Sequence, residues 1–379
     1  MNRLFIIFSI LVIVPLAAYK PVTNEPQSDI DIVLCVDLSS STNGVLEILK
    51  QNIWRIMSDF AYYKPIPKVR FGFVAFGRPS YGKENKYVSI VSDLTYNYDQ
   101  LVEKLFEIRS VVAKGDCFIS DVVYTATKNI SWSKEESTLK LMYIVGNGSP
   151  FIGSADMQTV CETAHKRGIV INPVYYKSYA STSEEKKWMD FAESCGNNLS
   201  TVALLQPIVL LKKEYDNKVL FSSNTILNNT YVYYGKDGKT SQQNQLALDQ
   251  NAADAGENEM EARIVLKATE LYQHKNESWD LVDLTNKNGV DFLKMDKQFL
   301  PEEIKDYDSA KLEAYLLGKK KERADAIALI NMINQNRTDY LRALKKETEE
   351  KIKVDNSLPG IITKTSSQEA KDWGFSRMY

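Results

Sequence analysis

The sequence lacks the motifs by which common enzymes are recognised. It contains no G-x-S-x-G nucleophile motif, no phosphate-binding loop and no H-E-x-x-H zinc motif. Histidine, the most frequent general acid or base, occurs only at His165 and His274. Together these absences predict that the protein is not an enzyme.

The chain also has little excess charge of either sign. Its 379 residues carry a formal net charge of −2. Removing an N-terminal segment whose only charge is Arg3 leaves 46 basic and 49 acidic side chains, a net charge of −3. A balance so close to zero gives no sign of a nucleic-acid or membrane-surface partner, so we expect no nucleic acid to bind.

Cysteine is scarce and scattered. The four cysteines have no C-x-x-C spacing, which argues against a structural zinc site. An even number permits two disulfides with three possible pairings, and sequence does not choose between them. Cys35 lies inside an apolar run, where a free thiol packs as a small hydrophobe. The four positions are Cys35, Cys117, Cys161 and Cys195.

The first 18 residues predict a secretory signal. One basic residue, Arg3, precedes an apolar run over 4–16, which is shorter than the roughly 20 residues of a membrane-spanning helix. We expect cleavage after about residue 18 and a linker over 19–28. An uncleaved anchor is the alternative, because Leu16 is not small. The prediction is a secreted, periplasmic or cell-surface protein without an integral membrane domain after cleavage.

The most informative stretch follows that linker. An apolar run over 32–36 has the length and β-branched content of a buried strand, and it ends on Asp37-x-Ser39-x-Ser41. In open α/β sheets ligands bind beyond the carboxyl ends of strands. Clustered oxygen donors suit Mg²⁺ or a similar cation. With the amphipathic stretch 45–60 behind it, this motif resembles the metal-ion-dependent adhesion site (MIDAS) of von Willebrand factor type A (VWA) domains.

The resemblance covers residues 29–205 and implies an α/β fold. It predicts a doubly wound, mostly parallel sheet with one antiparallel edge strand. The residue patterns agree, because apolar strand-like runs alternate with segments of helical spacing. We expect strands over 69–76, 86–91, 139–145, 169–176 and 199–205, and helices over 45–61, 98–108, 156–166 and 183–195.

Two further loops belong to the implied metal site. The family presents a threonine near Asp116 and an aspartate near Asn147, so this site departs from the family pattern at both positions. Asp116 could supply a carboxylate in place of the hydroxyl. Alternatively, it caps a helix beginning near Ser120 or Asp121, or Cys117 occupies the position as a poor Mg²⁺ ligand. The predicted metal ligands are therefore Asp37, Ser39, Ser41, Asp116 and Asn147.

The resemblance implies a binding protein. Its expected function is protein–protein binding or adhesion through a degenerate MIDAS-type site holding Mg²⁺, or Mn²⁺ or Ca²⁺. An acidic group of the protein partner would complete the coordination of that cation. Because the site is degenerate, a metal-free site stays open as an alternative. The protein would then be a metal-independent scaffold that assembles through its C-terminal helices.

The rest of the chain is predicted to be mainly helical. We expect a mixed connecting region over 206–300, with β-like alternation at 224–238 and a helix over 259–274. Pro301 followed by two acidic residues favours a helix start, and 301–355 has the pattern of long amphipathic helices. Residues 356–379 have the composition of a loose tail.

Overall fold

In a computed structural model, the described residues are 29–42, 44–111, 115–177, 182–203, 217–273, 275–287, 295–347 and 355–378. The predicted signal sequence and linker, residues 1–28, lie outside this set. Six strands form one sheet in the order β4-β3-β1-β5-β6-β7. They are β1 (Asp29–Asp37), β3 (Lys68–Phe76), β4 (Val88–Thr95), β5 (Leu139–Gly146), β6 (Ile169–Lys177) and β7 (Ser200–Ala203).

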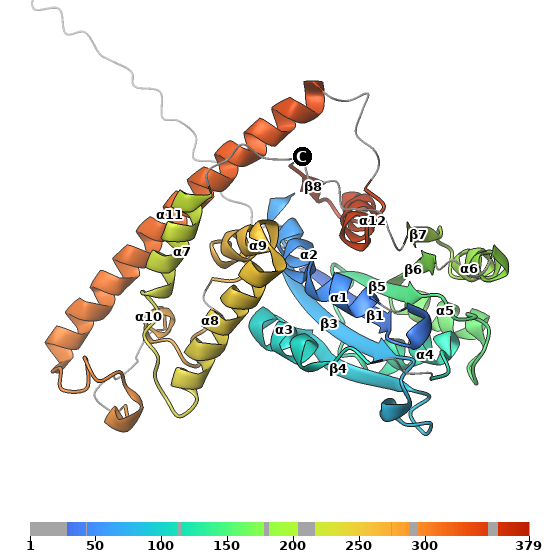
Figure 1. The fold of residues 1–379 in the computed structure, drawn as a ribbon, viewed down its shortest axis with the longest axis horizontal. Coiled ribbons are helices and arrows are strands. Elements are labelled where there is room, and N and C mark those ends of the chain that lie inside the picture. Colours follow the sequence, from blue (N-terminus) through green and yellow to red (C-terminus); the bar gives the residue numbers. More distant parts are fainter. Residues whose placement is uncertain are drawn as a thin grey trace, which may run out of the picture.

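The predicted fold class is confirmed. Neighbouring strands are parallel throughout except at the edge, where β4 runs antiparallel to β3. The strand β1 lies between β3 and β5, with Asp37 opposite Phe76 and Val36 opposite Val145. Its apolar run is continuous rather than alternating because helices cover both faces of the sheet. This mixed α/β architecture is visible in Figure 1.

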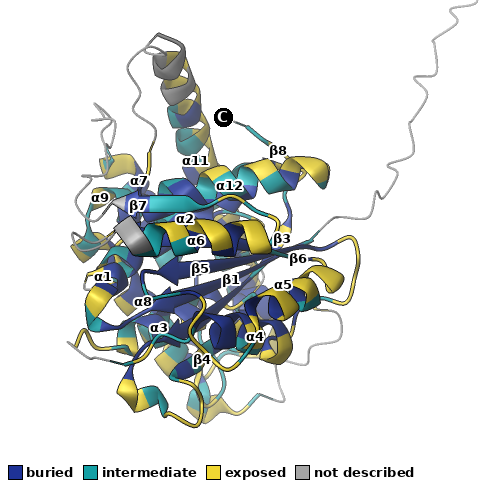
Figure 2. Cartoon of the chain, turned by 90° about the vertical axis from the view of Figure 1, so that its right-hand side faces the viewer, coloured by how far each residue is buried: buried dark blue, intermediate teal, exposed yellow. Residues whose placement is uncertain are grey.

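Helices pack on both faces of the sheet, and the strands β1 and β5 between them are coloured as buried in Figure 2. The side chains of β1 enter both cores, since Ile32 and Leu34 belong to one apolar cluster and Val33 and Cys35 to the other. The first cluster includes residues of α1 (Val45–Lys50), α2 (Ile53–Asp59), α3 (Tyr98–Glu107) and α12 (Leu358–Asp372). The second includes residues of α4 (Ile119–Asn129), α5 (Met157–Lys166) and α6 (Thr182–Ser194).

The prediction of a loose tail over 356–379 is wrong. Residues 358–372 form α12, which begins with a Ser357 cap and packs Ile361 and Ile362 into the sheet core. The Tyr143 hydroxyl of β5 hydrogen-bonds the Ser366 hydroxyl at 2.6 Å. After α12, β8 (Ser376–Arg377) pairs with β2 (Tyr63–Lys64). The predicted domain 29–205 therefore lacks one of the helices that cover its sheet.

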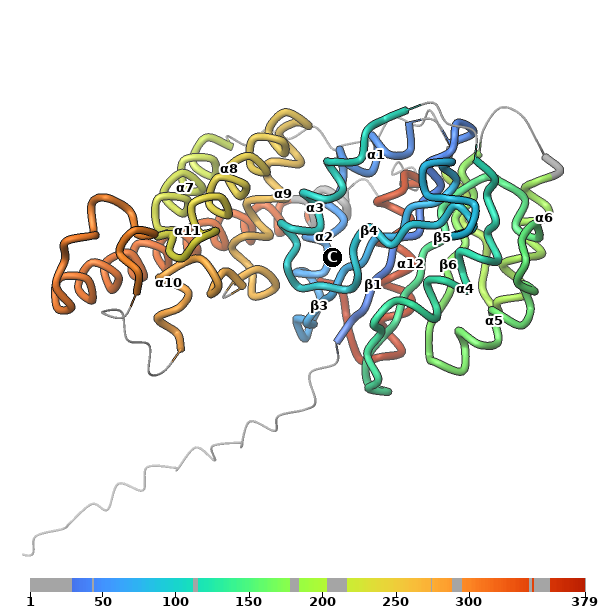
Figure 3. The backbone as a smooth tube through the Cα atoms, turned by 90° about the horizontal axis from the view of Figure 1, so that it is seen from below, coloured from blue at the N-terminus to red at the C-terminus, as the bar shows by residue number. Residues whose placement is uncertain are grey.

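Between β7 and α12 the chain forms a mainly helical layer beside the sheet (Figures 1 and 3). Short 3-10 helices occur before this layer, as η1 (Ser40–Thr42), η2 (Phe60–Tyr62) and η3 (Pro79–Tyr81), and within it, as η5 (Lys297–Phe299). The layer contains α7 (Lys218–Asn228), α8 (Gly238–Ala255), α9 (Glu257–Lys267), α10 (Leu281–Leu284) and α11 (Ser309–Glu347). None of the helices among the described residues is long and apolar enough to cross a membrane.

The β-like prediction for 224–238 is wrong over most of its length. Residues up to Asn228 are helical because the Asn224 and Asn228 amides, one turn apart on α7, both donate to the buried Asp249 carboxylate. Helix α8 already begins at Gly238. The only β pairing of this stretch among the described residues is an isolated bridge between Tyr233 and Asp280.

The helix start predicted at Pro301 is also wrong. Residues 301–307 form hydrogen-bonded turns, and Ile304 is buried in a small apolar cluster with Leu312. Helix α11 begins at Ser309, where the Asp308 side chain accepts a hydrogen bond from the Lys311 backbone N–H at 2.8 Å. This aspartate satisfies an N–H group of the first turn, which Pro301 cannot do.

A buried network of charges joins the helical layer to the sheet domain. The Arg263 side chain of α9 lies over the Trp54 ring of α2, with the guanidinium carbon 4.2 Å from the ring centroid. Arg263 forms ion pairs with Asp99 of α3 and with Asp249 of α8, the latter at 2.9 Å. Lys267 contacts the same Asp249 at 2.7 Å. These buried cations are all paired, as burial requires.

We predict that substitutions on α12 destabilise the sheet domain. Ile362 is 1% exposed, so Ile362→Ala should lower the free energy of unfolding by about 2–5 kcal/mol through lost burial and a cavity. Urea unfolding of the full chain measures this change. Lys364→Ala, on the exposed side of the same helix, is the control and should change it by less than about 0.5 kcal/mol. Equal effects of the two variants would contradict the packing of α12.

We predict a pH-dependent loss of stability from Glu259 of α9. Burial raises the pKa of Glu259 to about 8. In the unfolded chain this carboxyl group has its ordinary pKa of about 4.5, so its contribution to stability falls as pH rises from about 4.5 to 8. Each unit by which the folded-state pKa exceeds the unfolded-state pKa corresponds to about 1.4 kcal/mol of unfolding free energy lost over this pH range.

Glu259→Gln should remove this slope. The variant should unfold at a higher urea concentration than wild type at pH 8, and the gain should shrink toward pH 5. Chemical unfolding at several pH values measures the difference. A gain of the same size at both pH values would show that Glu259 does not titrate in this range.

Candidate functional site

The predicted site residues lie at the carboxyl-terminal edge of the parallel sheet. Asp37 is the last residue of β1, and Asn147 directly follows β5. Ser41 lies in η1, directly beyond β1. Because β1 and β5 run parallel side by side, their carboxyl ends bring these residues together.

Asp37 is fully buried. Its Oδ1 atom accepts a hydrogen bond from the Ser39 backbone N–H at 2.8 Å. The Oδ2 atom is buried and has no hydrogen-bond partner within the described part of the chain. Burial raises the pKa of Asp37, while the hydrogen bond from the Ser39 backbone and the nearby polar groups of Ser39, Cys117 and Asn147 lower it. A buried carboxylate oxygen without a partner is costly unless a ligand satisfies it.

The loop after β1 is held in a fixed conformation. The Ser39 and Ser41 hydroxyls hydrogen-bond each other at 2.8 Å. The Thr42 hydroxyl donates to the Asp37 carbonyl at 2.7 Å, which closes the loop over the strand end. The Asn147 side-chain amide donates to the Ser41 carbonyl at 2.8 Å. The structure therefore brings Asp37, Ser39, Ser41 and Asn147 together, with the amide of Asn147 bracing the loop.

Asp116 is not brought into this group. Its side chain is exposed, whereas the thiol of the next residue, Cys117, points toward the Asp37 carboxyl group. Burial and the neighbouring Asp37 charge raise the pKa of Cys117. The helix behind it, α4, begins at Ile119. Of the alternatives open from sequence, the structure matches the one that sets Cys117 beside the site.

Glycines allow these loops to meet. Gly77 follows β3 with φ +83°, and a Cβ atom placed on it would lie 2.6 Å from Asp37 Oδ1 and 3.0 Å from Cys117 Sγ. A Cβ atom on Gly115 would lie 2.4 Å from the Gly77 carbonyl oxygen. The Cβ position of Gly77 is thus bordered by the Asp37 carboxylate, the Cys117 thiol and the Ser39 side chain, whose Cβ is 3.1 Å from it.

Sequence reasoning missed Arg78. This side chain is 6% exposed, and its Nε donates to the Leu38 carbonyl at 3.1 Å while Nη1 donates to the Arg109 carbonyl at 2.8 Å. It therefore ties the loop after Asp37 to the loop after α3. An arginine directly after a glycine at a strand end was the available signal, but its partners are backbone carbonyls that sequence does not reveal.

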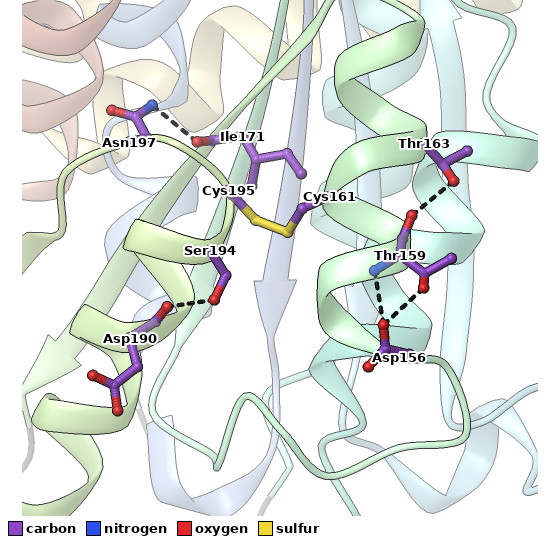
Figure 4. Close-up of a disulfide and its surroundings, with 9 residues drawn as sticks. All are labelled: Asp156, Thr159, Cys161, Thr163, Ile171, Asp190, Ser194, Cys195 and Asn197. Atoms are coloured by element: carbon purple, nitrogen blue, oxygen red, sulfur yellow. Dashed lines mark hydrogen bonds between the residues drawn. A yellow bond between two sulfur atoms is a disulfide. The ribbon is translucent and has the colours of Figure 1, made fainter.

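One disulfide fixes the cysteine pairing that sequence left open. Cys161 of α5 bonds Cys195, directly after α6 (Figure 4). Next to it, the Asn197 amide donates to the Ile171 carbonyl of β6 at 2.9 Å, so this turn is held against the sheet. Cys35 and Cys117 are free thiols. Cys35 is buried in β1 as expected, and Cys117 remains beside Asp37.

These donors fit a single bound cation. The unpartnered Asp37 oxygen supplies negative charge, and the Ser39 and Ser41 hydroxyls supply neutral oxygen donors. Among the described residues no cluster of three or more His, Cys, Asp or Glu side chains is placed to hold a metal. A cation here would therefore depend on one carboxylate together with hydroxyl groups.

The solved structures that are similar to this chain include VWA domains. No family model and no curated protein sequence matches the chain. The SpRpn10 VWA domain is 13% identical with a TM-score of 0.33, over 48% of this chain and 90% of that one. Proximal thread matrix protein 1 from the mussel byssus, with a zinc-occupied MIDAS motif, is 17% identical with a TM-score of 0.35, over 46% and 42%. A von Willebrand factor type A protein from Catenulispora acidiphila is 12% identical with a TM-score of 0.35, over 48% and 39%.

We predict that Gly77→Ala disrupts the site through crowding. Alanine at φ +83° is strained, and its Cβ would also press on Asp37. Gly235→Ala is the matched control, because Gly235 has φ +75° but no atom within 4 Å of the added Cβ. The control should lose about 1–2 kcal/mol of unfolding free energy from strain alone. Gly77→Ala should lose more, as measured by urea unfolding, and equal losses would contradict the close approach.

Proposed function

We propose that this chain is an exported binding protein whose VWA-type domain takes an acidic group of a protein partner at the carboxyl edge of the sheet. A divalent cation held there would link the two. The single observation that carries this proposal is the Oδ2 atom of Asp37, which is buried and unpartnered among the described residues, at the start of a loop whose Ser39 and Ser41 hydroxyls hydrogen-bond each other.

The protein's own residues have separate roles in this proposal. Asp37 would hold the cation through Oδ2, while its Oδ1 stays fixed by the Ser39 backbone N–H. Ser39 and Ser41 would offer their hydroxyl oxygens, and Asn147 would keep the Ser41 loop in place. The bound cation would supply the local positive charge that attracts a carboxylate.

The proposal assigns a role in binding rather than catalysis because the sequence contains none of the recognised catalytic motifs. Export is supported by the signal-like pattern of residues 1–18 and by the Cys161–Cys195 disulfide, since disulfides persist mainly in oxidising compartments. The partner in this proposal is a protein, and the near-neutral charge gives no reason to expect nucleic acid.

The second candidate function is a metal-independent scaffold. The observation that favours it is a set of exposed apolar side chains on the long helix α11, with Leu317 68% exposed, Met332 54% and Tyr340 38%. These side chains are spread along α11 at positions 317, 332 and 340, so a partner would have to contact the helix along its length. Assembly through this helix would persist in EDTA, which separates it from binding at the sheet edge.

The proposal predicts that a divalent cation stabilises the protein through Asp37. Thermal unfolding would be recorded in EDTA and then with Mg²⁺, Mn²⁺, Ca²⁺ or Zn²⁺. A cation at a hundred times its dissociation constant should add about 2.7 kcal/mol to the free energy of unfolding of the wild type. Asp37→Asn should abolish this gain. In EDTA the same variant should be at least as stable as wild type, because it removes an uncompensated buried carboxyl group.

Asp116→Asn is the matched control for this experiment. Its side chain is exposed and apart from the site, so the variant should keep the full response to metal. No response of the wild type to any of the four cations would overturn the metal-dependent proposal. Loss of the response in Asp116→Asn would restore Asp116 as a ligand.

A further inference from the structure

The thiol of Cys117 occupies an unusual place for a free cysteine. It borders the same point as Asp37 Oδ1 and the Ser39 side chain, namely the position that a Cβ on Gly77 would fill. A Cβ on Gly148 would lie 2.8 Å from the Cys117 Cβ, so the residue is fixed between close backbone segments. Its sulfur therefore has a set position toward the buried carboxylate.

A second observation shows that this is a site rather than a lone cysteine. Asp37 is 0% exposed, and its Oδ2 lacks a hydrogen-bond partner within the described residues. The Ser39 and Ser41 hydroxyls lie in the same loop at 2.8 Å from each other. One sulfur and one carboxylate thus border the same point as the Ser39 side chain, and the Ser39 hydroxyl is hydrogen-bonded to that of Ser41.

We propose that this site selects a thiophilic divalent cation, of the class of Zn²⁺ and Cd²⁺, over Mg²⁺, with Cys117 as a sulfur ligand beside Asp37. This inference rests on the proposed function, because it assumes that a cation binds at the edge of the sheet. The inference adds the class of metal that binds and the ligand, Cys117, that determines the preference.

The donor set determines this preference. Mg²⁺ takes oxygen ligands, retains water and gains little from a thiol. Zn²⁺ accepts mixed sulfur and oxygen ligands and is satisfied by four of them, which is the number of side-chain donors at this strand end. Cys117 would give its thiol proton to solvent as its sulfur lone pair forms the bond to the metal, and no electron is transferred.

Ultraviolet absorption with Cd²⁺ as the probe tests the proposal directly. Thiolate bound to Cd²⁺ absorbs through ligand-to-metal charge transfer, which oxygen ligands do not produce. The full chain, freed of metal with EDTA and desalted, should develop this absorption up to one equivalent of Cd²⁺. Cys117→Ser should lose it. Cys35→Ala, which removes the other free thiol, should keep it.

Thermal unfolding of the same proteins measures selectivity. The ratio of the apparent affinity for Zn²⁺ to that for Mg²⁺ should fall at least tenfold from wild type to Cys117→Ser, because serine restores an oxygen donor. Asp37→Asn should weaken the response to both metals.

The outcomes separate this inference from the proposed function. Stabilisation of wild type by Mg²⁺ with no charge-transfer absorption overturns the role of Cys117 and leaves the metal-dependent site standing. Absorption that survives in Cys117→Ser also overturns it. No binding of Mg²⁺, Mn²⁺, Ca²⁺, Zn²⁺ or Cd²⁺ by wild type overturns both.

Discussion

The burial of β1 is the constraint on which the rest of the structure depends. This strand pairs on both edges and is covered on both faces, so the chain at its carboxyl end is still inside the protein. Asp37 is the first side chain that could face a ligand, yet it has not reached solvent. A carboxylate held in this position is costly unless a ligand or a hydrogen-bond donor satisfies it. The tight loop, the glycines and Arg78 all serve to hold that arrangement.

The helical layer shares the core of the sheet domain. Leu248 of α8 and Leu266 of α9 belong to the same apolar cluster as Ile32 of β1. Arg263 then adds directional contacts to Asp99 and Asp249 at the centre of the junction. Continuous apolar burial together with a paired charge network favours one fixed arrangement over a hinged pair of domains. The candidate metal site lies at the carboxyl edge of the sheet, and the helical layer is fixed beside α2 and α3.

Much of the sheet could be predicted from sequence because its signals are local. A continuous apolar run specifies a strand buried on two faces, and Asp37-x-Ser39-x-Ser41 follows it directly. The sequence could not show whether Asp116 or Cys117 faces the site. The two residues are adjacent, and only the conformation of the loop decides which side chain points inward. Helix α12 was missed because its apolar positions are few and its partner strand β5 is far away in the sequence. Pro301 gave a false signal, since a proline suits the first turn of a helix and a turn equally well.

The position of α12 has a consequence for how the chain reaches its folded state. A sheet begun at residue 29 receives one of its covering helices only from residues 358–372. Contacts such as Tyr143 with Ser366 span more than two hundred positions. Contacts this distant slow folding, because the loop must be closed before they form. As the chain is synthesised, the apolar face over β5 stays uncovered while the whole helical layer is made. That face can therefore be covered by α12 only after residues 358–372 have been made, and apolar surface exposed in a partly folded chain favours aggregation.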